Sequence, residues 1–203
     1  YLLQKGRGGY RLGHDRIFDH MMLDGLEDAY EAGRSMGTFG EDCAAKYSFT
    51  REQQDAFATA SVQRAKAATE SGAFAAEIVP VTVKDRSGER VVSVDEGPGK
   101  VKLEKIATLK PAFKKDGTIT AASSSSINDG AAALVMMRES TAKKLGAKPL
   151  ARIVSHATHA QEPEWFATAP LGATQKALAK AGWQVGDVQL WEINEAFAVV
   201  PMA

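Results

Sequence analysis

The sequence predicts an α/β protein in which a helical and hairpin segment precedes layered α/β structure. Two β-rich runs, at 78–83 and 90–94, flank a polar stretch rich in turn-forming residues and indicate a hairpin. Later in the chain, β-type sequence at 150–158, a helical pattern at 171–181 and β-type sequence at 189–193 follow one another. That order is typical of an α/β unit with a right-handed crossover.

Composition excludes several functional classes. The chain has 203 residues, and its 25 Lys and Arg balance its 25 Asp and Glu, so no basic excess indicates a nucleic-acid partner. No apolar run approaches the roughly 20 residues that span a bilayer, so no membrane partner is expected. A single cysteine excludes an intramolecular disulfide and favours a reducing, cytoplasmic location. No signal peptide opens the chain, and its abrupt start at Tyr1 and end at Ala203 indicate a piece of a longer protein.

Residues 1–117 are predicted to be the helical and hairpin part. The glycine- and arginine-rich segment 1–14 is either a solvated loop, which we favour, or an anion site. Apolar residues at three-to-four spacing predict a helix over 15–32. Thr50 and Gln53 form a capping-box pattern at the start of an alanine-rich helix that should end near Gly72.

Residues 118–203 are predicted to be an incomplete α/β layer. The small-residue run at 118–126 leads into Asn128-Asp129-Gly130, a strong turn signal. A serine run can be a flexible linker. Because β-type sequence bounds this one on both sides, an ordered, packed turn is expected instead.

Asn194 is the most informative polar residue. It follows the predicted strand 189–193, at the strand end where ligands bind in α/β sheets. Its amide could donate to an oxyanion, directly or through a water. It could equally be a helix N-cap, and position alone slightly favours the cap.

A set of blocks spread over the chain is similar in order and spacing to the motifs of the thiolase family. The blocks are Met36-Gly37, Arg51-Glu52-Gln53-Gln54-Asp55, Glu77-Ile78-Val79-Pro80, Leu109-Lys110-Pro111-Ala112-Phe113, Gly117-Thr118-Ile119-Thr120-Ala121, Asn128-Asp129-Gly130-Ala131-Ala132, Arg152-Ile153-Val154-Ser155 and Asn194-Glu195-Ala196-Phe197-Ala198. The resemblance implies a thiolase-like fold with a loop domain inserted in the first of two α/β halves. Residues 1–117 would be most of that loop domain, and residues 118–203 the end of the first half and the start of the second.

The resemblance also implies a function and a site. The complete protein would be an acyl-CoA C-acetyltransferase that performs Claisen condensation or thiolysis through a cysteine acyl-enzyme, with acyl-CoA and CoA as partners and no cofactor or metal. Asn194 would fix the oxyanion-hole water, and Ser125 would contact the pantetheine arm of CoA. The walls around that arm would be Phe113, Ala121, Met36, Leu26 and Phe197. Thiolases are homodimers or homotetramers, so self-association is expected.

Two departures from the family pattern concern the CoA end of the site. Ser35 stands where some members carry His before the Met-Gly pair, and Gly97-Pro98-Gly99-Lys100 stands where some place Arg near the CoA head. Lys100 or Lys102 could bind the nucleotide, but a solvated charge run is the simpler reading.

The family's nucleophilic cysteine would lie before Tyr1, and its histidine base and second cysteine beyond Ala203. The 203 residues alone are therefore expected to be inactive. Cys43 is interpreted as a small buried hydrophobe, and His14, His20, His156 and His159 as surface or packing residues. The alternative is a non-catalytic CoA-binding or assembly module derived from a thiolase.

Overall fold

The computed structural model describes residues 1–203, which form two compact units. The first unit comprises Tyr1–Ser125 and Glu195–Ala203, and the second comprises Ser126–Asn194. The loop-domain boundary expected after residue 117 stays a prediction. The elements of the first unit are η1 (Met22–Leu26), α1 (Met36–Tyr47), α2 (Arg51–Glu70), β1 (Val81–Asp85), β2 (Gly88–Val92), α3 (Gly97–Lys100), η2 (Leu103–Thr108), η3 (Ala121–Ser123) and α6 (Val199–Met202).

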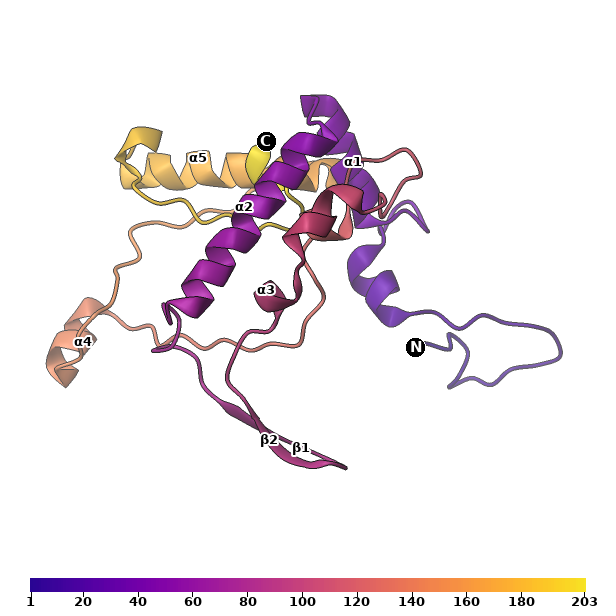
Figure 1. The fold of residues 1–203 in the computed structure, drawn as a ribbon, viewed down its shortest axis with the longest axis horizontal. Coiled ribbons are helices and arrows are strands. Elements are labelled where there is room, and N and C mark those ends of the chain that lie inside the picture. Colours follow the sequence, from indigo (N-terminus) through magenta and orange to yellow (C-terminus); the bar gives the residue numbers. More distant parts are fainter. The chain divides into compact units, whose positions relative to one another are not determined.

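The helix α2 forms as the sequence predicts. The Thr50 hydroxyl accepts from the Gln53 N–H, and the Gln53 side chain accepts from the Thr50 N–H, so the expected capping box is confirmed. Arg51, in the first turn, donates to the carbonyls of Ile106 and Leu109 and so ties α2 to the segment around η2. A distant part of the chain is thereby fixed beside α2 (Figure 1).

The core of the first unit lies around α1. Phe39, Cys43 and Ala44 of this helix are almost completely buried. So are Ile119, from the segment before η3, and Val199, which opens α6. Three segments far apart in the sequence therefore share one apolar core, which the hydrophobic effect stabilises.

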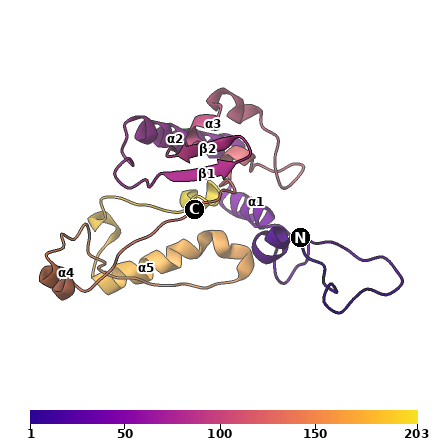
Figure 2. The same ribbon diagram turned by 90° about the horizontal axis from the view of Figure 1, so that it is seen from below.

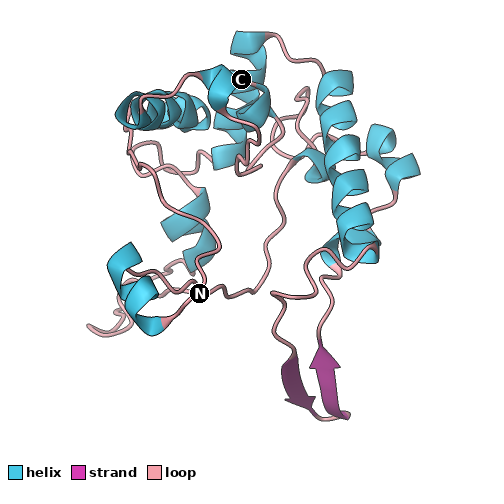
Figure 3. Ribbon diagram, turned by 90° about the vertical axis from the view of Figure 1, so that its left-hand side faces the viewer, coloured by secondary structure: helices cyan, strands magenta, loops and turns pink.

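The predicted hairpin is confirmed, with both strands shifted toward a shorter turn. β1 and β2 pair antiparallel, with Val81 opposite Val92 and Asp85 opposite Gly88. The Asp85 carboxylate accepts from the Ser87 N–H at 2.7 Å and closes the turn. The hairpin extends away from α1 and α2 (Figures 1 and 3). Most of its side chains are exposed.

The second unit contains only helices and extended segments. Its elements are α4 (Glu139–Leu145), η4 (Pro163–Thr168), α5 (Ala169–Ala181) and η5 (Val185–Asp187). The expected helix at 171–181 is confirmed and begins two residues earlier; it ends at Gly182, whose φ of 70° suits glycine. Lys176 and Lys180 of α5 donate to the carbonyls of Thr158 and His156, so the segment before η4 runs along this helix (Figure 2).

Two secondary-structure predictions are wrong. The expected helix over 15–32 is reduced to the five residues of η1. Ile17, Met21 and Met22 remain exposed, so the apolar face has no core to cover, and packing is what stabilises most helices in proteins.

The predicted strands 150–158 and 189–193 are extended, but their backbone groups form no ladder. A strand exists through its neighbours, and these segments have none within residues 1–203. No helix of the chain has the length and apolar character needed to cross a membrane.

Candidate functional site

The serine-rich turn is ordered and packed up to Ser124, as expected, whereas residues 125–130 are exposed and the turn expected at Asn128-Asp129-Gly130 does not form. The Thr120 hydroxyl accepts from the Ala122 N–H, and the Ser123 hydroxyl accepts from the Thr120 N–H at 2.9 Å. The Ser124 hydroxyl donates to the Thr120 carbonyl at 2.8 Å. The run of small polar residues thus satisfies its own backbone and holds a fixed shape rather than acting as a linker.

This turn pairs with the segment that precedes α6. The Ala198 N–H donates to the Ser123 carbonyl and the Ser125 N–H donates to the Ala196 carbonyl, both at 2.9 Å, which makes an antiparallel bridge between Ser124 and Phe197. Two motifs more than 70 residues apart in the sequence are therefore joined by an isolated β-bridge. The Ser125 side chain is exposed and makes no hydrogen bond within the chain, so its hydroxyl is free for a ligand.

Aromatic rings and glycines form one wall beside the turn. The rings of Phe113 and Phe197 meet edge to face with centroids 5.6 Å apart. Gly37, next to Met36 in α1, has no room for a Cβ because the Phe113 ring lies directly on it. A Cβ on Gly40, one turn further, would meet the Ile119 side chain at 2.7 Å and Phe197 at 3.2 Å. Gly37 and Gly40 thus leave a face of α1 without side chains, and the rings of Phe113 and Phe197 pack on it.

Two more predicted wall residues lie on neighbouring segments. Ala121 opens η3. Leu26 ends η1, and a bridge between Glu27 and Ser35 joins η1 to the start of α1. All six predicted CoA-contacting residues therefore belong to the first unit. The segments that carry them are linked by the Glu27–Ser35 bridge, by the Phe113–Phe197 contact and by the pairing of the serine-rich turn with residues 196–198. Their contact with CoA stays a prediction.

Asn194 is the last residue of the second unit, and its side chain is exposed. It does not cap a helix, because α6 begins five residues later with Ala198 at the cap position. Its amide makes no hydrogen bond within the chain. The helix-cap interpretation is therefore wrong. The oxyanion-hole role stays a prediction.

Cys43 is buried within α1, as expected for a packing residue. Burial raises the pKa of its thiol, and the nearby positive charge of Lys46 opposes this only in part. Because the thiolate is the nucleophilic form, a buried thiol with a raised pKa is poorly suited to attack a thioester. Among the histidines, His14, His20 and His156 are exposed, and His159 is half-buried, with hydrogen bonds to Gln161 and Lys176.

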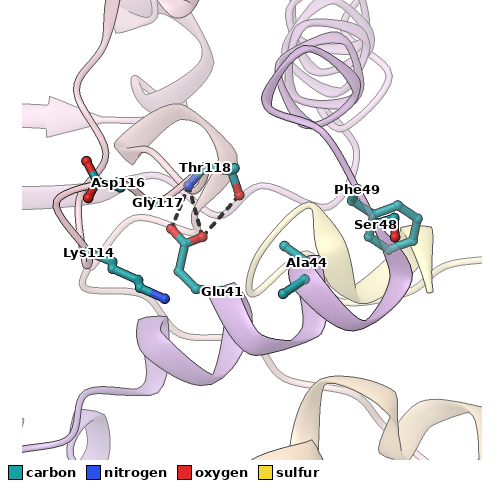
Figure 4. A pocket seen from close by; sticks show the side chains of 9 residues that line it. Glu41, Ala44, Ser48, Phe49, Lys114, Asp116, Gly117 and Thr118 are labelled. Atoms are coloured by element: carbon teal, nitrogen blue, oxygen red, sulfur yellow. Dashed lines mark hydrogen bonds between the residues drawn. The ribbon is translucent and has the colours of Figure 1, made fainter.

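Sequence reasoning missed Glu41. This residue is only 6% exposed, and its carboxylate accepts hydrogen bonds from the N–H groups of Thr118 and Ile119 and from the Thr118 hydroxyl. It lines a cavity of about 290 Å³ together with residues of α1 and of the 114–118 segment (Figure 4). A lone Glu five residues after Met36 gives no sequence signal. Only the fold brings it to the glycine at 117.

The sequence profile of the thiolase N-terminal domain matches residues 1–140, and that of the thiolase C-terminal domain matches residues 147–203. The chain belongs to the thiolase family. A probable acetyl-CoA acetyltransferase of Dictyostelium discoideum is 50% identical and aligns with the whole chain and 49% of its own length. An acetyl-CoA acetyltransferase of Rhizobium meliloti is 49% identical over 95% of the chain and 49% of its own length.

Solved thiolase structures share this fold. The acetyl-CoA acetyltransferase of Bacillus anthracis matches the whole chain with a TM-score of 0.94 at 43% identity, and the chain covers 51% of it. That of Syntrophomonas wolfei matches with a TM-score of 0.89 at 41% identity, again with 51% covered. The predicted fold class is confirmed, although the hairpin holds the only paired strands. The chain spans about half the length of the thiolase relatives it matches.

Proposed function

We propose that the protein containing these residues is an acyl-CoA C-acetyltransferase that catalyses thiolysis of a 3-ketoacyl-CoA and the reverse Claisen condensation. The observation that carries the proposal is the pairing of the serine-rich turn with residues 196–198, beside the Phe113 and Phe197 rings. That arrangement offers a free hydroxyl at Ser125 next to an apolar wall. A flexible, amide-bearing and otherwise weakly polar pantetheine arm suits such a surface. The relatives that bear the name acetyl-CoA acetyltransferase support the same reaction class.

In this proposal Ser125 donates to or accepts from the amides of the arm, while Met36, Leu26, Ala121 and the two phenylalanines exclude water from it. Asn194 holds a water that donates to the thioester or enolate oxygen as negative charge develops there. The acylated cysteine and the base come from outside residues 1–203. CoA is a substrate and product, so no cofactor is required.

The proposal is tested with the full-length protein. Acetoacetyl-CoA and CoA are supplied, and formation of two acetyl-CoA per acetoacetyl-CoA is followed by chromatography. We expect turnover by the full-length protein and none by residues 1–203 alone. Cys43→Ala in the full-length protein should retain activity, because the buried thiol takes no part. A folded full-length protein that neither cleaves acetoacetyl-CoA nor forms it would refute the proposal.

We further propose that the complete enzyme is a cytoplasmic homodimer or homotetramer that acts in fatty-acid metabolism. The exposed apolar residues of 131–137 and of the hairpin support self-association, because large exposed apolar patches mark interaction surfaces. Light scattering after size exclusion would give the oligomeric state. A monomer at micromolar concentration would contradict the proposal.

A further inference from the structure

We propose that Glu41 is a positioning residue for the CoA-binding turn: its carboxylate clamps the main chain at Thr118 and Ile119 and so sets where Ser125 stands. The inference rests on the proposed function and adds a residue that takes no direct part in it. Glu41 lies on α1, five residues after Met36. Figure 4 shows its carboxylate directed at Thr118.

The clamp uses the whole carboxylate. Oε1 accepts from the Thr118 N–H at 2.9 Å and the Ile119 N–H at 2.8 Å. Oε2 accepts from the Thr118 N–H at 2.9 Å and the Thr118 hydroxyl at 3.1 Å. No Lys or Arg forms an ion pair with Glu41. The buried charge is therefore balanced by donors of one short stretch of backbone, and hydrogen bonds to a charged group are the stronger kind.

Two other features fit this clamp. Gly117 has no room for a Cβ because the Glu41 carboxylate lies against it, so a glycine is needed for the approach. The Gln54 amide, fully buried in α2, donates to the Thr118 hydroxyl at 2.8 Å. Thr118 is therefore held from α1 and α2 at once, and it has no freedom to shift along either helix.

From Thr118 the constraint passes along the chain to Ser125 through buried and hydrogen-bonded residues on either side of Ala121. Ile119 is fully buried, and its carbonyl accepts from the Ala112 N–H, next to Phe113. Thr120 is fully buried and closes the cap of η3. Ser123 and Ser125 then pair with residues 196–198. Apart from the exposed Ala121, each residue between the clamp and Ser125 is buried or hydrogen-bonded, so a shift at Thr118 is passed on to Ser125 and to the Phe113 wall.

Two substitutions of Glu41 distinguish the effect of its side-chain length from the effect of its charge. Glu41→Gln keeps the length: its oxygen can accept from both N–H groups, and its NH2 can donate to the Thr118 hydroxyl. Glu41→Asp keeps the charge but is one methylene shorter and cannot reach both N–H groups. If the clamp acts by position, Glu41→Asp should raise the KM for CoA by about tenfold, the equivalent of about 1.4 kcal/mol, with kcat little changed. Glu41→Gln should stay close to wild type.

The experiment uses the full-length enzyme, and circular dichroism confirms that each variant is folded. The dissociation constant of CoA, from calorimetry, accompanies the kinetics. Glu70→Asp, at the exposed end of α2, is the matched control and should change nothing. In a Ser125→Ala background the Glu41→Asp effect on KM should shrink, because Glu41 acts through Ser125. If Glu41→Asp does not fold, Thr118→Val removes the hydroxyl that bonds both Glu41 and Gln54, keeps the two N–H bonds to Glu41, and should raise KM to a smaller extent.

Distinct results would overturn the positioning role or the proposed function. The positioning role is overturned if the wild type is active and Glu41→Asp has an unchanged KM and an unchanged affinity for CoA. Where Glu41→Asp does not fold, the same result in Thr118→Val overturns it. Either result leaves the proposed function intact. A KM raised in Glu41→Gln but not in Glu41→Asp also overturns it, since charge and not reach would then matter. Full additivity with Ser125→Ala shows that Glu41 does not act through Ser125. A wild type that neither turns over nor binds CoA refutes the proposed function, and the inference falls with it.

Discussion

Replacing Gly37 with alanine tests the aromatic wall of the site. The Phe113 ring occupies the space in which a Cβ on Gly37 would stand. The ring cannot stay in place, and it also meets Phe197 edge to face. The substitution therefore displaces Phe113 and disturbs both the pantetheine wall and the core near Phe197.

The magnitude follows from three terms. Overpacking of this kind costs about 1–3 kcal/mol, and loss of the aromatic pair costs about 0.5–1.5 kcal/mol. Alanine in a helix returns up to about 1 kcal/mol relative to glycine. We expect a net loss of stability of about 1–3 kcal/mol, measured by thermal or urea unfolding of the full-length protein. The KM for CoA should rise as well.

The control is Gly99→Ala in α3, where nothing lies within 4 Å of the added Cβ. The unfolding midpoint of Gly99→Ala should equal that of the wild type or be slightly higher. If Gly37→Ala were as stable as Gly99→Ala, with an unchanged KM, the Phe113 ring would not pack on Gly37 in solution. The wall as described would then be refuted.

The further predictions concern three single residues. Asn194→Ala in the full-length enzyme should lower kcat by about 10²–10³-fold, because one oxyanion donor is lost; a wild-type rate would remove the oxyanion role. Cys43 should resist alkylation in the native protein, as peptide mass spectrometry after iodoacetamide can show. Folding raises the pKa of the Cys43 thiol, so the unfolded chain loses this proton first as pH rises above the ordinary thiol value of 9.0. The free energy of unfolding should therefore fall in that pH range. A Cys43→Ala variant with the same alkaline decline would contradict this. Thr50→Ala removes half of the capping box and should cost about 1 kcal/mol of unfolding free energy, whereas the exposed Thr82→Ala in the hairpin should cost less.

What the sequence could predict here was local. The capping box at Thr50 and Gln53, the polar turn between 83 and 90, and Gly182 after α5 each carry their structural reason within a few residues. The order of the family blocks likewise predicted the fold class. None of these required knowledge of a distant contact.

The rest depends on partners far away in the chain. The apolar spacing at 15–32 is genuine, but the helix it suggests has nothing to pack on. The segment 150–158 has strand-forming side chains but no neighbour to pair with. Glu41 is the converse case, because its meaning comes entirely from Thr118, a residue 77 positions later. The spacing of residues in the sequence shows neither that a packing partner is missing nor that a distant contact is present.

Residues 131–137 are extended, uncharged and free of proline, with Leu134, Val135 and Met136 exposed. Stretches of that composition stack readily into cross-β assemblies when nothing covers them. A cell making only these 203 residues would accumulate them in inclusion bodies.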